Sequence, residues 1–144
     1  MTHSAIAGAH GFWSVTFDAL AMSFQPKYLC ASSREEGVAL VDVLVGEVWV
    51  TAGQSNMAWA GDRTGWLDKE GLLPPGVRYA HTGRNASYRP QDDLSERAAW
   101  LPCHEDNARG LSTIPYLFGK YLHSKLQVPV GIVNAASGGA EGNF

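Results

Sequence analysis

The chain has few cysteines, no cluster of basic residues and no long uninterrupted apolar run. Its two cysteines, Cys30 and Cys103, are too few for a disulfide framework and have no suitably spaced histidines for a zinc site. The sequence does not show whether they pair with each other, and we interpret them as small buried residues. The cysteine content therefore supports neither a metal centre nor a disulfide-stabilised scaffold.

Charge and hydropathy argue against further classes of protein. The formal net charge is -3 and no basic block is present, which gives nucleic-acid binding no electrostatic support. The longest apolar run, 38–51, is interrupted by Asp42, Gly46 and Glu47 and is too short to span a membrane. The first residues have no basic region followed by an apolar core, so no signal peptide is recognised. With 45% hydrophobic and 17% charged residues, the composition is that of a globular protein.

Residues 11 to 46 are rich in strand signals. "FWSVTF" alternates apolar and polar residues, as a half-buried strand does. "PKYLCAS" and "VALVDVLV" are two more candidate strands, and the latter ends at Gly46. This pattern predicts a small antiparallel unit of three strands, which needs another layer to cover its apolar face.

From Glu47 onward the pattern changes to α/β. "EVWVTA" and "VPVGIVNAA" are apolar on both faces, which is typical of strands buried in a parallel sheet, and "VRYAHT" is a weaker strand. Between them, apolar residues recur with a period near 3.6 after Ser112 or Thr113, either of which suits a helix cap. Strand, helix and strand in this order predict a parallel crossover connection.

The stretch "TAGQSNM" places Ser55 directly after the "EVWVTA" strand. In α/β sheets, ligands bind beyond the carboxyl ends of the strands, and Gly53 allows a sharp turn there. A second turn, Ser137-Gly138-Gly139, follows the other buried strand, so both turns are expected at the same rim of the sheet. One offers a hydroxyl and the other unencumbered N–H groups, a combination that suits acyl transfer. A helix cap at Ser55 and a plain turn at 137–139 are the alternative interpretations.

Two blocks resemble a known family. "VLVGEVWVTAGQSNMAW" is similar to the nucleophile block of the sialate O-acetylesterase branch of the SGNH hydrolases. "STIPYLFGKYLHSKLQVPVGIVNAASGG" is similar to the helix and strand that lead into that family's second block. "GFWSVTFDAL" resembles the end of the β domain that precedes the catalytic domain. The resemblance covers most of residues 11 to 139, and only loosely residues 61 to 110.

The resemblance implies a partial flavodoxin-like (SGNH) three-layer α/β/α sandwich preceded by a small antiparallel β unit, with residues 1–46 ending an N-terminal β domain and 47–144 beginning the esterase domain. It implies a serine esterase that removes O-acetyl groups from sugars such as sialic acid. Ser55 would be the nucleophile, its N–H and that of Gly138 or Gly139 the oxyanion hole, and Gln54 and Asn56 would shape the turn or line the pocket. No cofactor or metal is implied. The family suggests a secreted or periplasmic protein.

The sequence lacks the catalytic base that the family resemblance implies. The family's histidine follows an aspartate by two or three residues, and none of the five histidines has that spacing. They are His3, His10, His81, His104 and His123. The family's third block, which is similar to Trp-x-Gln-Gly-Glu, is also absent. We therefore expect an N-terminal fragment of such an esterase, with the C-terminal half of the domain as a possible partner.

Two hypotheses remain open: an acetylesterase piece that carries the nucleophile, and a catalytically inactive fragment or glycan-binding remnant. His104, beside Glu105 and Asp106, is the one candidate for a substitute base, but a polar loop is the favoured interpretation there. His123 is expected on the solvated side of the helix. Because an incomplete sandwich leaves apolar strands uncovered, we expect the isolated chain to be poorly soluble, molten or oligomeric.

Overall fold

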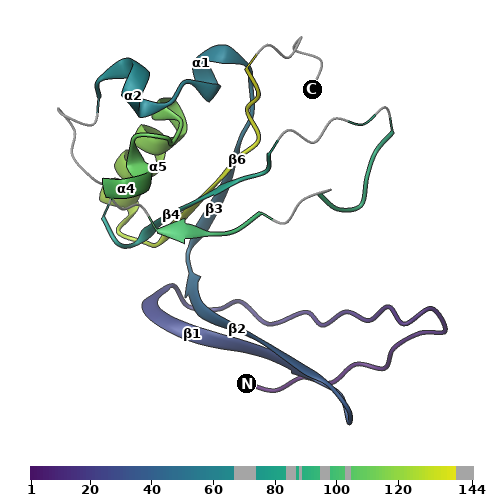
Figure 1. Cartoon of the computed structure of the whole chain (residues 1–144). Coiled ribbons are helices and arrows are strands. Elements are labelled where there is room, and N and C mark those ends of the chain that lie inside the picture. Colours follow the sequence, from purple (N-terminus) through teal and green to yellow (C-terminus); the bar gives the residue numbers. More distant parts are fainter. Residues whose placement is uncertain (67–73, 84–86, 88, 95–97, 103–104, 139–144) are drawn as a thin grey trace.

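The computed structural model describes residues 1–66, 74–83, 87, 89–94, 98–102 and 105–138. They form two sheets, one of two strands and one of four, with helices packed against the larger sheet (Figure 1). The expected mixed α/β class is confirmed. The expected division into domains at residues 46 and 47 stays a prediction, although one strand ends at Val45 and the next begins at Glu47.

The smaller sheet is an antiparallel ribbon of β1 (Ser23–Ser32) and β2 (Gly37–Val45). A register shift between the pairs Lys27↔Val43 and Leu29↔Leu40 marks a β-bulge, where Asp42 adopts a positive φ of 58°. The sequence predicted three strands here, and the third, over "FWSVTF", is wrong. Residues 12–17 form no strand, because alternation alone does not make a strand that has no neighbour to pair with.

The larger sheet has the strand order β3-β6-β4-β5. β3 (Glu47–Thr51), β6 (Val130–Asn134) and β4 (Val77–His81) run parallel, and β5 (Leu101–Pro102) pairs antiparallel with β4. The predicted parallel crossover is therefore confirmed. The expectation that β3 is buried on both faces is wrong, because β3 is an edge strand and its Val48, Trp49 and Val50 are exposed.

The main helix, α5 (Thr113–Leu126), begins and ends close to where its periodicity predicted. The other helices, α1 (Ser55–Ala58), α2 (Gly61–Thr64) and α4 (Glu105–Ala108), have four residues each. Ser112 occupies the N-cap position of α5, but its side chain makes no capping hydrogen bond. The structure thus supports Ser112 as the residue before the helix but not as a side-chain cap.

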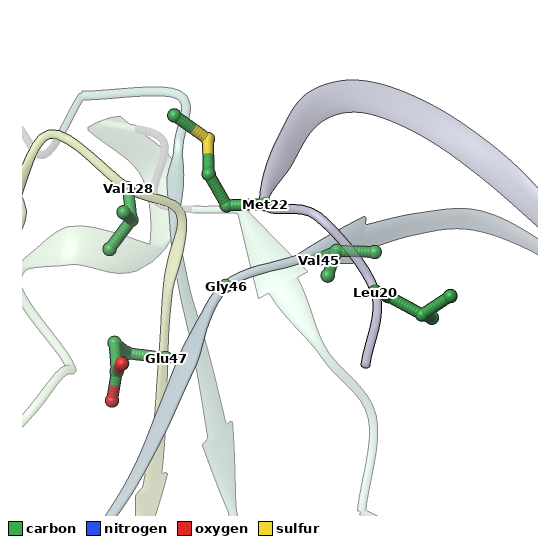
Figure 2. A pocket seen from close by; sticks show the side chains of 6 residues that line it. All are labelled: Leu20, Met22, Val45, Gly46, Glu47 and Val128. Atoms are coloured by element: carbon green, nitrogen blue, oxygen red, sulfur yellow. The ribbon is translucent and has the colours of Figure 1, made fainter. Parts of the chain in front are cut away.

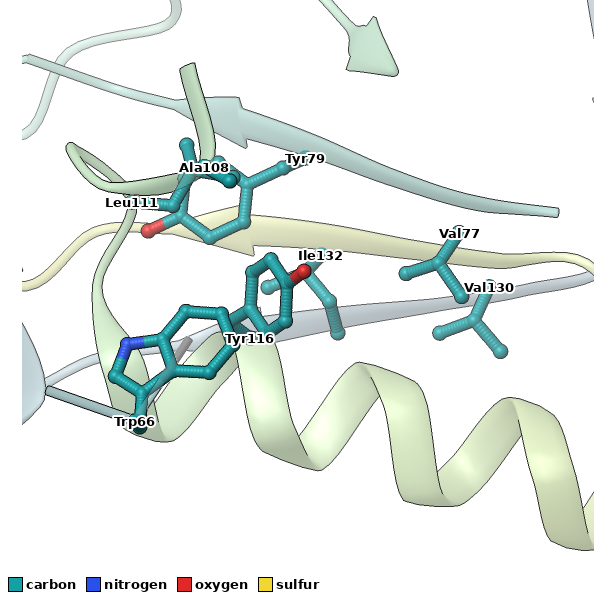
Figure 3. Packing of buried hydrophobic residues seen from close by; sticks show 8 residues of the cluster. All are labelled: Trp66, Val77, Tyr79, Ala108, Leu111, Tyr116, Val130 and Ile132. Carbon is teal, nitrogen blue, oxygen red and sulfur yellow. The ribbon is translucent and has the colours of Figure 1, made fainter. Parts of the chain in front are cut away.

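The core lies between α5 and the inner face of the larger sheet. Ile132 and Val77 pack on α5 at Gly119, where an added Cβ would lie 2.9 Å from Ile132 Cγ1, so glycine permits the close approach. Tyr116 of α5 is fully buried, and its ring centroid lies 4.0 Å from that of Trp66. Figure 3 shows the whole cluster, which consists of Trp66, Val77, Tyr79, Ala108, Leu111, Tyr116, Val130 and Ile132.

A few contacts join the ribbon to the larger sheet. The Arg78 guanidinium lies 2.8 Å from Asp42 Oδ1 and also donates to the Asp42 carbonyl. The ring of Phe24 in β1 meets His123 edge-on, with centroids 5.7 Å apart. A shallow hollow lies at the junction around Gly46 (Figure 2), and it is lined by Leu20, Met22, Val45, Gly46, Glu47 and Val128.

Two expectations about single residues are wrong. Cys30 is free and exposed rather than buried, because it lies on the uncovered ribbon, and Cys103 lies outside the described residues. His123 is half-buried rather than solvated, because the ring of Phe24 in β1 lies edge-on against it. Its Nδ1 is 2.6 Å from the Val128 carbonyl oxygen.

Candidate active site

Ser55 lies where β3 ends and α1 begins. The carbonyl of Gln54 accepts hydrogen bonds from Met57 N (2.9 Å) and Ala58 N (3.1 Å), which closes the first turn of the short helix. Gly53 has a φ of 146°, and an added Cβ would lie 2.8 Å from Met57 Cγ. Both its conformation and the lack of space require glycine at this position.

The turn at Ser55 and the turn after β6 lie beside each other. Parallel pairing sets Thr51 opposite Asn134, and Ala135 N donates to the Thr51 carbonyl over 2.8 Å. Beyond the strands, Ser137 N donates to the Gly53 carbonyl over 3.0 Å. A backbone hydrogen bond therefore joins the two glycine-containing turns at the rim where the sequence expects them.

The remaining predicted site residues differ in exposure. The side chain of Ser55 is half-buried, and its hydroxyl forms no hydrogen bond with another described residue. Gln54, Asn56 and Gly138 are exposed at the same rim, while Gly139 lies outside the described residues. The rim thus presents a hydroxyl with polar side chains and a glycine turn beside it.

Asn134 lies beneath the rim, and sequence reasoning missed it. It is fully buried, its Oδ1 accepts from Thr51 Oγ1 (3.2 Å) and Ala136 N (3.1 Å), and its Nδ2 donates to Ser112 Oγ (2.8 Å). These bonds connect the end of β3, the turn after β6 and the residue before α5. The available signal was an amide residue at the end of an otherwise apolar strand, since a buried amide needs partners.

Tyr79 adds a second buried polar group to this layer. Its hydroxyl lies close to Ser112 and Asn134 without forming a hydrogen bond of normal geometry. Burial raises the pKa of Tyr79 above its ordinary value, while the proximity of Ser112 and Asn134 partly opposes the shift. The phenol therefore stays protonated at neutral pH and is no base for Ser55.

The described histidines form no hydrogen bond with Ser55. His81 ends β4 in register with Asn134, so it lies at the same rim, but its Nδ1 accepts from Gly83 N over 2.8 Å. In a neutral imidazole this places the proton on Nε2, which is then a donor. His123 lies against β1, and His3 meets the ring of Phe17 edge-on. His104, the substitute base considered from the sequence, lies outside the described residues.

Among the described residues, no group of three or more histidine, cysteine, aspartate or glutamate side chains is placed to hold a metal ion. None of the described helices combines the length and apolar character needed to cross a bilayer.

Comparison with known proteins finds matches both in sequence and in structure. The chain is 34% identical to mouse (Mus musculus) sialate O-acetylesterase over 107 residues, which are 68% of this chain and 20% of that protein. Its structure is similar to the crystal structure of a carbohydrate acetylesterase from Xanthomonas citri, with a TM-score of 0.81 and 29% identity, over 92% of this chain and 31% of that one. No protein-family model matches the chain.

These matches confirm the resemblance and the fold class expected from the sequence. The chain spans about a fifth of the curated relative and less than a third of the solved structure. Neither match tests the roles expected for Ser55, Gln54, Asn56, Gly138 and Gly139, which stay predictions.

Proposed function

Because the chain resembles the carbohydrate acetylesterases in both sequence and fold, we propose that it carries the nucleophile turn of a serine esterase that removes O-acetyl groups from sugars such as sialic acid. The observation that carries the proposal is the hydrogen bond from Ser137 N to the Gly53 carbonyl. It holds a glycine turn beside the serine turn at the carboxyl ends of two parallel strands, where α/β proteins bind their ligands.

The proposed reaction is acyl transfer through Ser55. The Ser55 hydroxyl oxygen attacks the acetyl carbonyl, the hydroxyl proton passes to a base, and the sugar leaves as an alcohol once it has regained a proton. Water then attacks the acetyl-serine and releases acetate, which restores the hydroxyl. Neither step requires a metal or an organic cofactor.

Backbone N–H groups would stabilise the oxyanion. We assign this role to the N–H of Ser55 together with that of Gly138 or Gly139, because donors fixed in advance stabilise developing negative charge most effectively. Gln54 and Asn56 are exposed on either side of Ser55, so their amide groups are free to meet the hydroxyls of an acetylated sugar. In this proposal residues 1–46 end a β domain and 47–144 begin the esterase domain.

A second candidate is a non-catalytic function, as an inactive fragment or a glycan-binding remnant. The observation that favours it is the placement of the histidines, because no described histidine forms a hydrogen bond with Ser55 and His81 has its Nδ1 engaged. A serine without a base is a weak nucleophile. In that case turnover would need a complementary segment, such as the C-terminal half of an esterase domain, to supply the base.

Hydrolysis of 4-nitrophenyl acetate by the purified chain separates the two candidates. If the chain is an esterase, the wild type turns over, Ser55→Ala does not, and the control Ser124→Ala, on the exposed side of α5, keeps the wild-type rate. Equal background rates in all three would contradict turnover by this chain alone and favour the second candidate. Saturation-transfer NMR with O-acetylated sialic acid then tests for glycan binding, which the second candidate predicts for wild type and Ser55→Ala alike.

A further inference from the structure

The short helix that begins at Ser55 has little to hold it in place by itself. All of α1 is described, none of its four residues is buried, and the side chain of Gln54 at its N-cap position forms no capping hydrogen bond. Isolated helices shorter than about 12 residues are marginal in water. A misplacement of about 1 Å in a reacting group can cost about a hundredfold in rate. If Ser55 is the nucleophile, residues outside α1 must therefore fix its position.

The buried amide of Asn134 is held in one orientation by a backbone group. Ala136 N lies 3.1 Å from one end of this amide, and because an N–H group only donates, that end is the carbonyl oxygen, Oδ1. The other end, Nδ2, then donates to Ser112 Oγ over 2.8 Å. Asn134 is fully buried and Ser112 is 5% exposed, so little water competes for these bonds.

The two ends of the amide connect to the two ends of the serine turn. Before the turn, Thr51 Oγ1 donates to Asn134 Oδ1 over 3.2 Å. After the turn, Ser112 Oγ accepts from Asn134 and directs its own proton to the carbonyl of Ala58, over a longer distance of 3.5 Å. Ala58 is the last residue of α1. The Asn134 side chain thus supports the turn both where it leaves β3 and where α1 ends.

The same amide also supports the glycine turn beside Ser55. Asn134 Oδ1 accepts from Ala136 N, and the next N–H along the chain, that of Ser137, donates to the Gly53 carbonyl over 3.0 Å. The oxyanion donors assigned above come from both turns. Their spacing therefore depends on the side chain that supports both.

We propose that Asn134 is the positioning residue of the candidate site. Through Thr51 and Ser112 it fixes both ends of the serine turn, and through Ala136 it fixes the glycine turn beside it. The inference rests on the proposed function for the role of Ser55 as nucleophile. Because Asn134 lies beneath the rim and acts by holding the reacting groups in place, weakening this network should lower kcat rather than raise KM.

Amide hydrogen exchange, followed by NMR on the full chain, tests the network without requiring turnover. Thr51→Val and Ser112→Ala each remove one hydroxyl from it. The reporters are Met57 N, which bonds within the serine turn, and Ser137 N, which bonds between the two turns. We expect both N–H groups to exchange about tenfold faster in each variant, because a turn that has lost a buried hydrogen bond opens more often.

Thr113→Val is the matched control for these variants. It removes another buried hydroxyl, which shares a hydrogen bond of 2.8 Å with Thr64 and lies outside the network, so both reporters should keep their wild-type exchange rates. Thr51→Ser keeps the hydroxyl and should also exchange slowly. Unchanged exchange in Thr51→Val, or equal acceleration by Thr113→Val, would overturn the proposal. The Thr51 variants decide the matter if Ser112→Ala does not fold.

Kinetics of 4-nitrophenyl acetate hydrolysis connect the network to the reaction. In an active chain, Thr51→Val and Ser112→Ala should lower kcat about tenfold and leave KM unchanged, while Thr113→Val keeps both constants. Faster exchange with an unchanged kcat would overturn the positioning role. Absence of turnover in the wild type would instead contradict the proposed function for this chain alone, and the exchange rates would then decide whether Asn134 holds the two turns.

Discussion

The β1–β2 ribbon and the larger sheet differ in what their strands bury. β1 and β2 have ten and nine residues, yet none of their side chains is buried. β4 and β6 have five residues each and contribute four of the eight core side chains. The difference is α5, which covers the inner face of the larger sheet, while among the described residues no helix covers the ribbon. A covering layer, rather than strand length or pairing, therefore determines burial.

Removing core volume should produce the largest effect and the clearest contrast between the two regions. Ile132→Ala removes a fully buried side chain that packs on Gly119, and we expect a loss of about 2–5 kcal/mol in the free energy of unfolding. Leu40→Ala on β2, where the side chain is 55% exposed, should cost less than about 1 kcal/mol. Urea titration followed by circular dichroism measures both. Equal losses would mean that the ribbon buries more than the structure shows.

The buried amide beneath the rim should come next. Asn134→Ala removes the hydrogen bonds to Thr51 Oγ1, Ala136 N and Ser112 Oγ, and we expect a loss of about 2–3 kcal/mol in the free energy of unfolding. Asn56→Ala is the control, because this exposed amide lies at the same rim and should change stability by less than about 0.5 kcal/mol. Thermal unfolding compares the two variants. A neutral Asn134→Ala would show that water replaces the lost bonds.

The link between the two regions should have a smaller effect. Arg78→Met removes both contacts with Asp42, and because the Asp42 side chain is 60% exposed we expect a loss of about 1 kcal/mol at most. The readout is limited proteolysis between β1 and β2, which should become faster as the ribbon detaches more often. Asp42→Asn keeps the carbonyl acceptor and should accelerate cleavage less. If Asp42→Asn were cleaved as fast as Arg78→Met, the bond to the carbonyl would contribute nothing.

The smallest change is expected from the Tyr79 hydroxyl, which has no hydrogen bond of normal geometry. Tyr79→Phe should leave stability at pH 7 within about 0.5 kcal/mol of wild type. Because the pKa of Tyr79 is raised in the folded state, the folded chain binds more protons than the unfolded chain above pH 10.0, so stability falls as the pH rises. Tyr79→Phe should weaken that alkaline loss. Urea midpoints between about pH 8 and 11 test this expectation, and identical slopes would contradict it.

Patterns along the sequence predicted the positions of helices and strands more accurately than they predicted which side chains are buried. The period of 3.6 located α5, and the apolar runs located β3 and β6. The interpretation of β3 as buried failed because an apolar run reports what a strand is suited to, whereas burial depends on which strands lie beside it. The alternating run at 12–17 failed for the same reason, since it has no partner among the described residues.

The two turns of the candidate site were predictable from the sequence, but the buried polar residues that lie beneath them were not. Ser55 follows β3 and Gly138 follows β6, and parallel pairing of neighbouring strands was enough to place both at one rim. The roles of Asn134 and Tyr79 depend on contacts between residues far apart in the sequence. Cross-strand register fixes those contacts, and a single sequence without a known strand order does not specify it.

The hydrogen bonds beneath Ser55 also determine the order in which parts of the molecule can form during synthesis. The hydrogen bond between Thr51 and Asn134 joins residues 83 positions apart, whereas β1 and β2 pair through a short turn. During synthesis the ribbon is complete soon after its residues leave the ribosome, but the support of the serine turn is not made until β6 follows. The turn that carries the proposed nucleophile is therefore supported only once the chain through β6 has been made, so a nascent chain that stops before β6 does not hold that turn in place.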